Sequence, residues 1–135
     1  MNTKILLTAS AFFLGLMGIG LSFLPNEIFI YLDMGSNPIL YLLLQLLGSL
    51  YLGFGIMNWM AKGTLIGGIY NRPMAIGNFM HFGVGAIALL KIVFGIKGHT
   101  EVIISLTVIY TILALCFAYV FLTNPIKVGT ENLNK

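Results

Sequence analysis

The residues best suited to chemistry are polar side chains inside two long apolar stretches of the chain. Asn58 lies in one stretch, and Asn78 and His81 lie in the next. Polar side chains within such stretches normally face the interior of a protein rather than its apolar surroundings. Side-chain amides and a neutral imidazole can hold a polar group by hydrogen bonds. These residues therefore predict a polar site between the two stretches.

Further residues extend this predicted site toward one end of the stretches. Tyr51, Asn58 and Lys62 follow one another at spacings typical of one helix face. Asn71 and Arg72 precede the second stretch, where a cationic side chain can attract an anion. The candidate ligand-binding residues are Tyr51, Asn58, Lys62, Asn71, Arg72, Asn78 and His81.

Two interpretations of this polar cluster remain open. In the structural one, Asn58, Asn78 and His81 join two helices by hydrogen bonds, each worth about 0.6 kcal/mol in a membrane. In the functional one, they line a pocket that opens to the inner leaflet and binds a lipophilic ligand with a polar head. Candidate ligands are a membrane phospholipid, a fatty acid or a quinone.

Motifs for catalysis are not found in the sequence. Metal catalysis needs several convergent ligands, whereas the chain has two histidines, far apart, and one cysteine. The sequence contains no phosphate-binding loop with its Lys and Ser or Thr, and no G-x-S-x-G serine motif. We therefore predict no catalytic residue, no metal and no cofactor, and expect a binding protein rather than an enzyme.

The positions of charged residues predict how the chain is organised. Of 135 residues, 59% are hydrophobic and 8% are charged, against about 25% charged in soluble proteins. Four uncharged stretches are long enough to cross a hydrocarbon core of about 30 Å. Backbone groups in lipid must be bonded within the segment, and no alternating pattern suggests a barrel. We expect transmembrane helices over residues 5–24, 39–60, 74–95 and 102–122.

The predicted fold class is all-α: a polytopic membrane four-helix bundle with up-down-up-down topology, forming a single membrane domain over residues 1–135. The loop 25–38 is expected to lie along the outer interface. Most cations would lie on the side of both termini, which places the termini in the cytoplasm of a bacterial inner membrane. A net charge of +3 is too small and too scattered for nucleic-acid binding. The cations on the terminal side are Lys4, Lys62, Arg72, Lys127 and Lys135.

Two of the predicted helices carry narrow faces of small residues. Such faces let helices approach closely within a chain, in a homo-oligomer or with a membrane partner protein. They support an alternative function, as an assembly or accessory subunit of a membrane complex. The first face consists of Thr8, Ala11, Gly15, Gly18 and Ser22, and the second of Thr107, Thr111, Ala114 and Ala118.

Three short runs resemble a signature of small bacterial four-helix membrane proteins. In size and expected topology the chain is also similar to the DoxX-like group. Members of that group are linked to redox-associated complexes and to assembly, so the resemblance implies a membrane accessory protein and no defined reaction. The runs are Asn58-Trp59-Met60, Gly67-Gly68-Ile69-Tyr70-Asn71-Arg72-Pro73 and Gly77-Asn78-Phe79-Met80-His81-Phe82.

Overall fold

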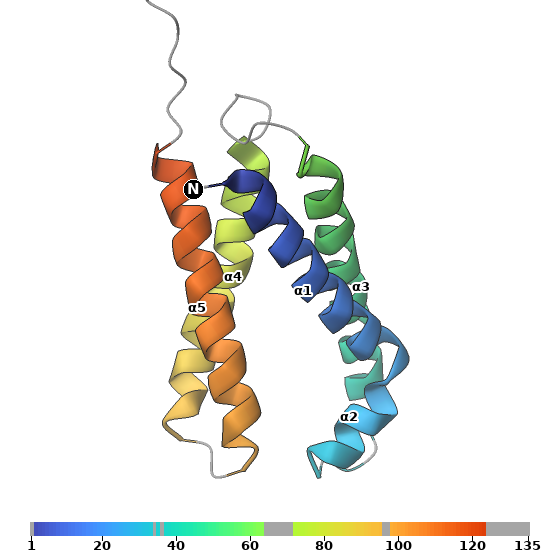
Figure 1. The fold of residues 1–135 in the computed structure, drawn as a ribbon. Coiled ribbons are helices and arrows are strands. Elements are labelled where there is room, and N and C mark those ends of the chain that lie inside the picture. The colour runs from blue at the N-terminus through green and yellow to red at the C-terminus, as the bar shows by residue number, and fades with distance from the viewer. Residues whose placement is uncertain (1, 34, 36, 64–71, 96–97, 124–135) are drawn as a thin grey trace, which may run out of the picture. The chain divides into compact units, whose positions relative to one another are not determined.

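The structure, a computed structural model, describes residues 2–33, 35, 37–63, 72–95 and 98–123. Within these residues the chain forms five helices and no strand. Figure 1 shows the helices, which are α1 (Thr3–Phe23), α2 (Pro25–Tyr31), α3 (Pro38–Ala61), α4 (Arg72–Val93) and α5 (Thr100–Thr123).

The helices α1, α3, α4 and α5 are long and apolar enough to cross a membrane. Their ends agree with the predicted transmembrane segments to within two residues. The prediction of an all-helical chain with four such segments is therefore confirmed, as a multi-pass membrane protein requires. The up-down-up-down bundle and the cytoplasmic position of the termini stay predictions.

Asparagine side chains begin two of the long helices. The Asn2 side chain accepts a hydrogen bond from the Lys4 backbone N–H at 3.1 Å. Asn37 accepts from the N–H groups of Ile39 and Leu40, at 3.0 and 3.4 Å, just before Pro38 opens α3. These caps satisfy amides that have no partner within the first turn of a helix. The sequence thus sets both starts locally.

The segment predicted as a loop between the first two spans contains the short helix α2. Phe29 is 3% exposed, and its ring lies 4.6 Å from that of Tyr41 at the start of α3. The Tyr41 hydroxyl donates to Asn26 Oδ1 at 3.2 Å. These contacts hold α2 against α3, so this loop has more structure than its length suggested. Its place at a membrane interface stays a prediction.

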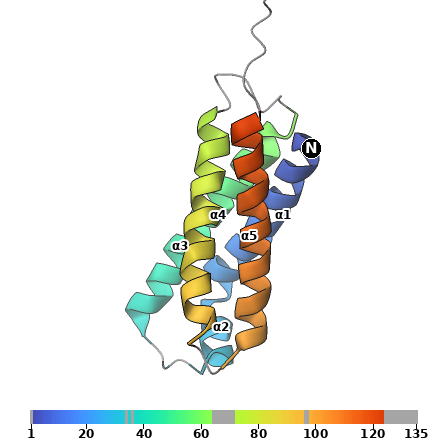
Figure 2. The same cartoon turned by 90° about the vertical axis from the view of Figure 1, so that its left-hand side faces the viewer.

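The helices fall into two compact units, one with α1, α2 and α3, the other with α4 and α5. Within the first unit α1 and α3 lie against each other and run in opposite directions (Figure 2). Within the second unit α4 and α5 do the same. The single membrane domain predicted for the whole chain stays a prediction.

The contact between α1 and α3 is made by small residues. A Cβ built on Gly48 would lie 2.7 Å from the Ser22 nitrogen and 2.9 Å from the Gly18 oxygen. A Cβ on Gly55 would lie 3.1 Å from the Gly15 nitrogen. The two backbones are thus closer than larger residues would permit. The predicted contact face of the first span is confirmed at these residues, and its partner is α3.

Aromatic side chains make the contact between α4 and α5. Phe82 has no exposed surface, stacks against Phe117 at 5.8 Å and meets Tyr110 edge-on at 5.3 Å. A Cβ built on Gly85 would lie 2.6 Å from Tyr110 Cδ1, so this glycine makes room for the ring. The α4–α5 pair is therefore joined by rings packed against rings and against a glycine.

The predicted small-residue face of α5 is not the face that carries the rings of Tyr110 and Phe117. The hydroxyls of Thr107 and Thr111 donate to carbonyls one turn earlier in their own helix, at 2.6 and 2.7 Å. Tyr110 and Phe117, which contact α4, lie on the neighbouring face. Large rings, rather than small residues alone, thus connect α5 to its partner.

Candidate functional site

Asn58, one of the predicted site residues, lies at the contact between α3 and α1. It has no exposed surface, and its amide Nδ2 donates to Ser10 Oγ at 3.0 Å. The Ser10 hydroxyl, also fully buried, donates to the Leu7 carbonyl at 3.1 Å. This chain of hydrogen bonds gives Asn58 a structural role, but it joins α3 to α1 and not to the third span that the structural interpretation named. Sequence reasoning missed Ser10, although its hydroxyl lies beside Ala11 of the small-residue face.

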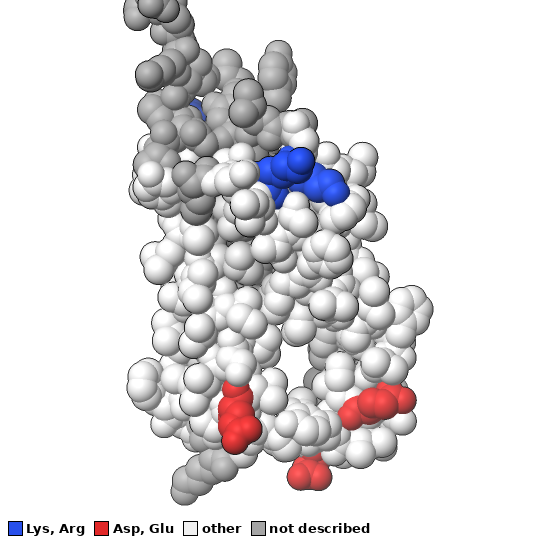
Figure 3. Space-filling model, viewed as in Figure 1, with Lys and Arg blue, Asp and Glu red and all other residues white. Residues whose placement is uncertain are grey.

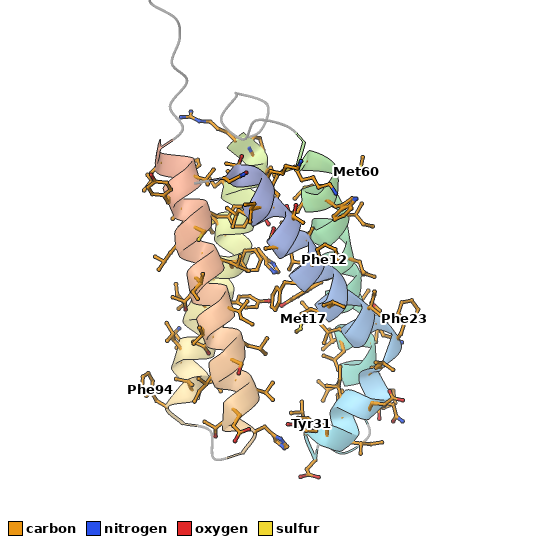
Figure 4. The ribbon with its side chains drawn as sticks, in the orientation of Figure 1. Phe12, Met17, Phe23, Tyr31, Met60 and Phe94 are labelled. Carbon is orange, nitrogen blue, oxygen red and sulfur yellow. The ribbon has the colours of Figure 1, made fainter. Side chains whose placement is uncertain are left out.

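Lys62 lies just after α3, at its C-cap. Its ammonium group is over the ring of Trp59, with Nζ 2.7 Å from the ring centroid, in a cation–π contact. Phe12 of α1, labelled in Figure 4, meets the same Trp59 ring edge-on at 5.5 Å. Lys62 is therefore held at the contact between α1 and α3. Tyr51, three turns before Lys62 on α3, is also buried, with 8% of its surface exposed.

The remaining predicted residues belong to α4. Arg72 is its first residue and is exposed. Asn78 has no exposed surface, and its amide donates to the Met74 carbonyl at 3.0 Å. His81 is half-buried and meets the ring of Phe82 edge-on at 5.0 Å. Asn71 lies outside the described residues.

The predicted site is thus divided between the two units. Tyr51, Asn58 and Lys62 lie along α3, whereas Arg72, Asn78 and His81 lie along α4. A common pocket of Asn58 with the α4 residues stays a prediction. The first unit has a hollow of its own, between α1 and α3, which the sequence did not indicate.

An apolar groove of about 410 Å³ lies between α1 and α3. It exists because Gly15 and Gly55 place no side chains there, while larger residues on either side form its walls. Sequence reasoning assigned Gly15 to helix contact and did not foresee the space beside it. The groove is lined by Ala11, Phe12, Gly15, Leu16, Ile19, Leu52, Gly55, Ile56 and Trp59.

Within the described part of the chain, no group of three or more His, Cys, Asp or Glu side chains could hold a metal ion. In comparisons with protein-family models, curated proteins and solved structures, nothing matches this chain. The DoxX-like resemblance therefore stays a prediction. Fold and site define an all-helical protein with four helices suited to cross a membrane, and with an apolar groove between α1 and α3.

Proposed function

We propose that this chain is a bacterial cytoplasmic-membrane protein that binds a lipophilic ligand with a polar head. The observation that carries this proposal is the α1–α3 groove with Lys62 beside it. Its ligand is a lipid, a fatty acid or a quinone, whose apolar part lies in the groove. Binding, and no defined reaction, is what these residues support.

The walls of the groove suit an apolar chain. Leu16, Ile19 and Ile56 are 70%, 50% and 60% exposed. In a membrane such side chains contact hydrocarbon, so an alkyl chain can enter from the side without crossing a polar barrier. An occupied groove also gains the dispersion contacts that an empty one loses. An alkyl or isoprenoid chain is therefore the occupant we propose.

The end of the groove at Trp59 suits the polar head. Tryptophan is frequent at the level of lipid headgroups, and the neighbouring Lys62 supplies a charge there. Lys4, in the first turn of α1, lies at the same end of this antiparallel pair. In Figure 3 the blue side chains near the start of α1 mark a basic end. With the positive-inside rule, this end faces the cytoplasm in our proposal.

The proposed position of the ligand's apolar part differs from the one that the sequence indicated. The sequence predicted a pocket between the second and third spans, whereas the groove lies between the first and second. Lys62 belongs to both versions of the site. A contribution of Arg72, Asn78 and His81 to the same ligand stays a prediction, because they belong to the other unit.

The alternative function, as an assembly or accessory subunit, has less support from the first span. Gly15, Gly18 and Ser22 of its small-residue face lie against α3 within the same chain. Much of that face therefore contacts α3, which leaves less of it for a partner. A homo-oligomer or a complex with another membrane protein would need a different surface.

Filling the groove tests the proposal. Gly15 lines the groove, and a Cβ built on it meets no atom within 4 Å, so Gly15→Phe puts a ring into open space. We expect the lipophile that co-purifies with the protein, identified by native mass spectrometry, to fall about tenfold in Gly15→Phe. The same measurement tells a lipid from a fatty acid or a quinone.

Gly53→Phe is the matched control, because Gly53 is an open helix glycine that does not line the groove. It should retain the wild-type amount of lipophile. Equal occupancy in both variants, or no bound lipophile in the wild type, would contradict the proposed function.

A further inference from the structure

The groove has chemically different ends. Its walls are hydrocarbon along their whole length, and its Trp59 end carries the Lys62 ammonium. Because α1 and α3 are antiparallel, the residues that line the groove follow opposite orders along the two helices. Phe12 and Trp59 meet at one end, and Ile19 and Leu52 lie toward the other. An amphiphile placed in it has one orientation that brings its head to a cation.

Charge is also distributed unevenly over the α1–α3 unit. Lys4 and Lys62 lie where α1 begins and α3 ends. The acidic side chains among its helices and the turn that follows α2 are Glu27 and Asp33, at the other end. Figure 3 shows acidic groups far from the basic ones of this unit. The Trp59 end of the groove therefore presents positive charge beside an apolar channel.

We propose that the α1–α3 groove is a binding site for an anionic phospholipid of the inner leaflet. One acyl chain lies along Leu16 and Ile56, and the phosphate accepts a hydrogen bond from the Lys62 ammonium. This inference rests on the proposed function and narrows its ligand to one class. The inner leaflet supplies such lipids at the end where the basic residues lie.

The Trp59 contact prepares Lys62 for this ligand. A lysine side chain has considerable conformational freedom, and the ring face restricts its ammonium to the mouth of the groove. The ring shields one side of the ammonium and leaves its other N–H donors for phosphate oxygens. A charge-assisted hydrogen bond there is stronger than one between neutral groups. A zwitterionic head brings its own cation close to Lys62 and gains less.

The test measures headgroup preference in the full-length protein by native mass spectrometry. Phosphatidylglycerol and phosphatidylcholine with identical acyl chains compete for the detergent-purified chain. We expect the wild type to prefer phosphatidylglycerol about tenfold. Lys62→Gln should bring the two lipids close to parity, whereas Lys62→Arg should keep the preference. Raised salt should weaken the wild-type preference, because it screens the attraction between the Lys62 ammonium and the phosphate.

Lys91→Gln is the control for charge removal, since Lys91 is an exposed lysine in the last turn of α4. It should leave the preference unchanged. If Lys62→Gln does not fold, the wild-type competition and its salt dependence still decide the inference. Equal binding of both lipids by the wild type, or an unchanged preference in a folded Lys62→Gln, overturns it. Displacement of phosphatidylglycerol by equimolar palmitate also overturns it, in favour of a fatty acid.

These outcomes are separate from those of the proposed function. Equal binding of the two phospholipids, both reduced by Gly15→Phe, removes the headgroup assignment and leaves the groove as a binding site. Binding of neither lipid, or no effect of Gly15→Phe on either, removes the proposed function itself.

Discussion

Asn58 and Ser10 form a buried polar pair. The free-energy cost of burying these two side chains depends on whether each keeps its hydrogen-bond partner. Neither residue has exposed surface. The Asn58 amide donates to the Ser10 hydroxyl, which donates to the Leu7 carbonyl. A buried polar group that loses its partner has no water to replace it in lipid. The pair therefore favours one register of α3 against α1, because a slipped register would leave the amide and the hydroxyl apart.

We expect Ser10→Ala to destabilise the protein by about 0.6 to 1.7 kcal/mol, the range of hydrogen bonds between membrane helices. Unfolding in mixed detergent micelles measures this change. Ser49→Ala is the matched control, because the exposed Ser49 hydroxyl bonds only within its own helix in the described structure, to Leu46 at 2.7 Å. It should change stability by less than Ser10→Ala.

A double-mutant cycle of Ser10→Ala with Asn58→Ala isolates the interaction between the two side chains. The two losses should not add, because either substitution breaks the same bond. Additive losses, or an effect of Ser10→Ala no larger than that of Ser49→Ala, would contradict the role assigned to this pair.

At the scale of helices, α3 carries glycines with opposite surroundings. A Cβ on Gly48 would meet the backbone of α1, at the Ser22 nitrogen and the Gly18 oxygen, 2.7 and 2.9 Å away. A Cβ on Gly53 would meet no atom within 4 Å. Backbone atoms cannot turn aside as a side chain can. Gly48 therefore determines how closely the two helices approach, and Gly53 does not.

We expect Gly48→Ala to lower the free energy of unfolding by about 1 to 3 kcal/mol, because the added methyl group must push α1 away. Gly53→Ala should be neutral or raise it by up to about 1 kcal/mol, because alanine favours the helix. Both changes can be measured by the same detergent unfolding. Equal effects of the two substitutions would show that α1 and α3 do not touch at Gly48.

At the scale of the whole molecule, four helices are suited to span a membrane, and short connections join them. The turn after α3 contains Gly63, and the connection between α4 and α5 contains Gly98. The proposed orientation places Gly63 in the cytoplasm and Gly98 outside. Both glycines are exposed, and a Cβ at either meets no atom within 4 Å.

Cysteine labelling tests this orientation in a Cys116→Ala background, since Cys116 is the single cysteine of the chain. A membrane-impermeant maleimide should label Gly98→Cys in spheroplasts made from intact cells, and Gly63→Cys only after the membrane is permeabilised. The reverse pattern would invert the proposed topology. Equal labelling of both sites before permeabilisation would contradict a membrane crossing between them.

Much of the secondary structure could be predicted from local information. The four long helices follow from uncharged apolar stretches and from the caps at Asn2 and Asn37. The helix α2 could not be predicted in the same way, because Phe29 and Tyr41 stabilise it through a contact with α3. The candidate site, too, could be predicted only where local sequence decides it. Asn58 was correctly expected to be buried, but its bond to Ser10 was not foreseen.

The sequence by itself determined that this chain forms helices suited to a membrane, because in lipid each backbone polar group must be bonded within its own segment. Only the tertiary structure decided that α3 packs on α1 and that Tyr110 and Phe117 pack on α4. Several faces of an apolar helix can meet a neighbour, so composition does not select the partner. The groove belongs to neither helix alone. It is the space left where small residues of α1 and α3 meet beneath larger ones.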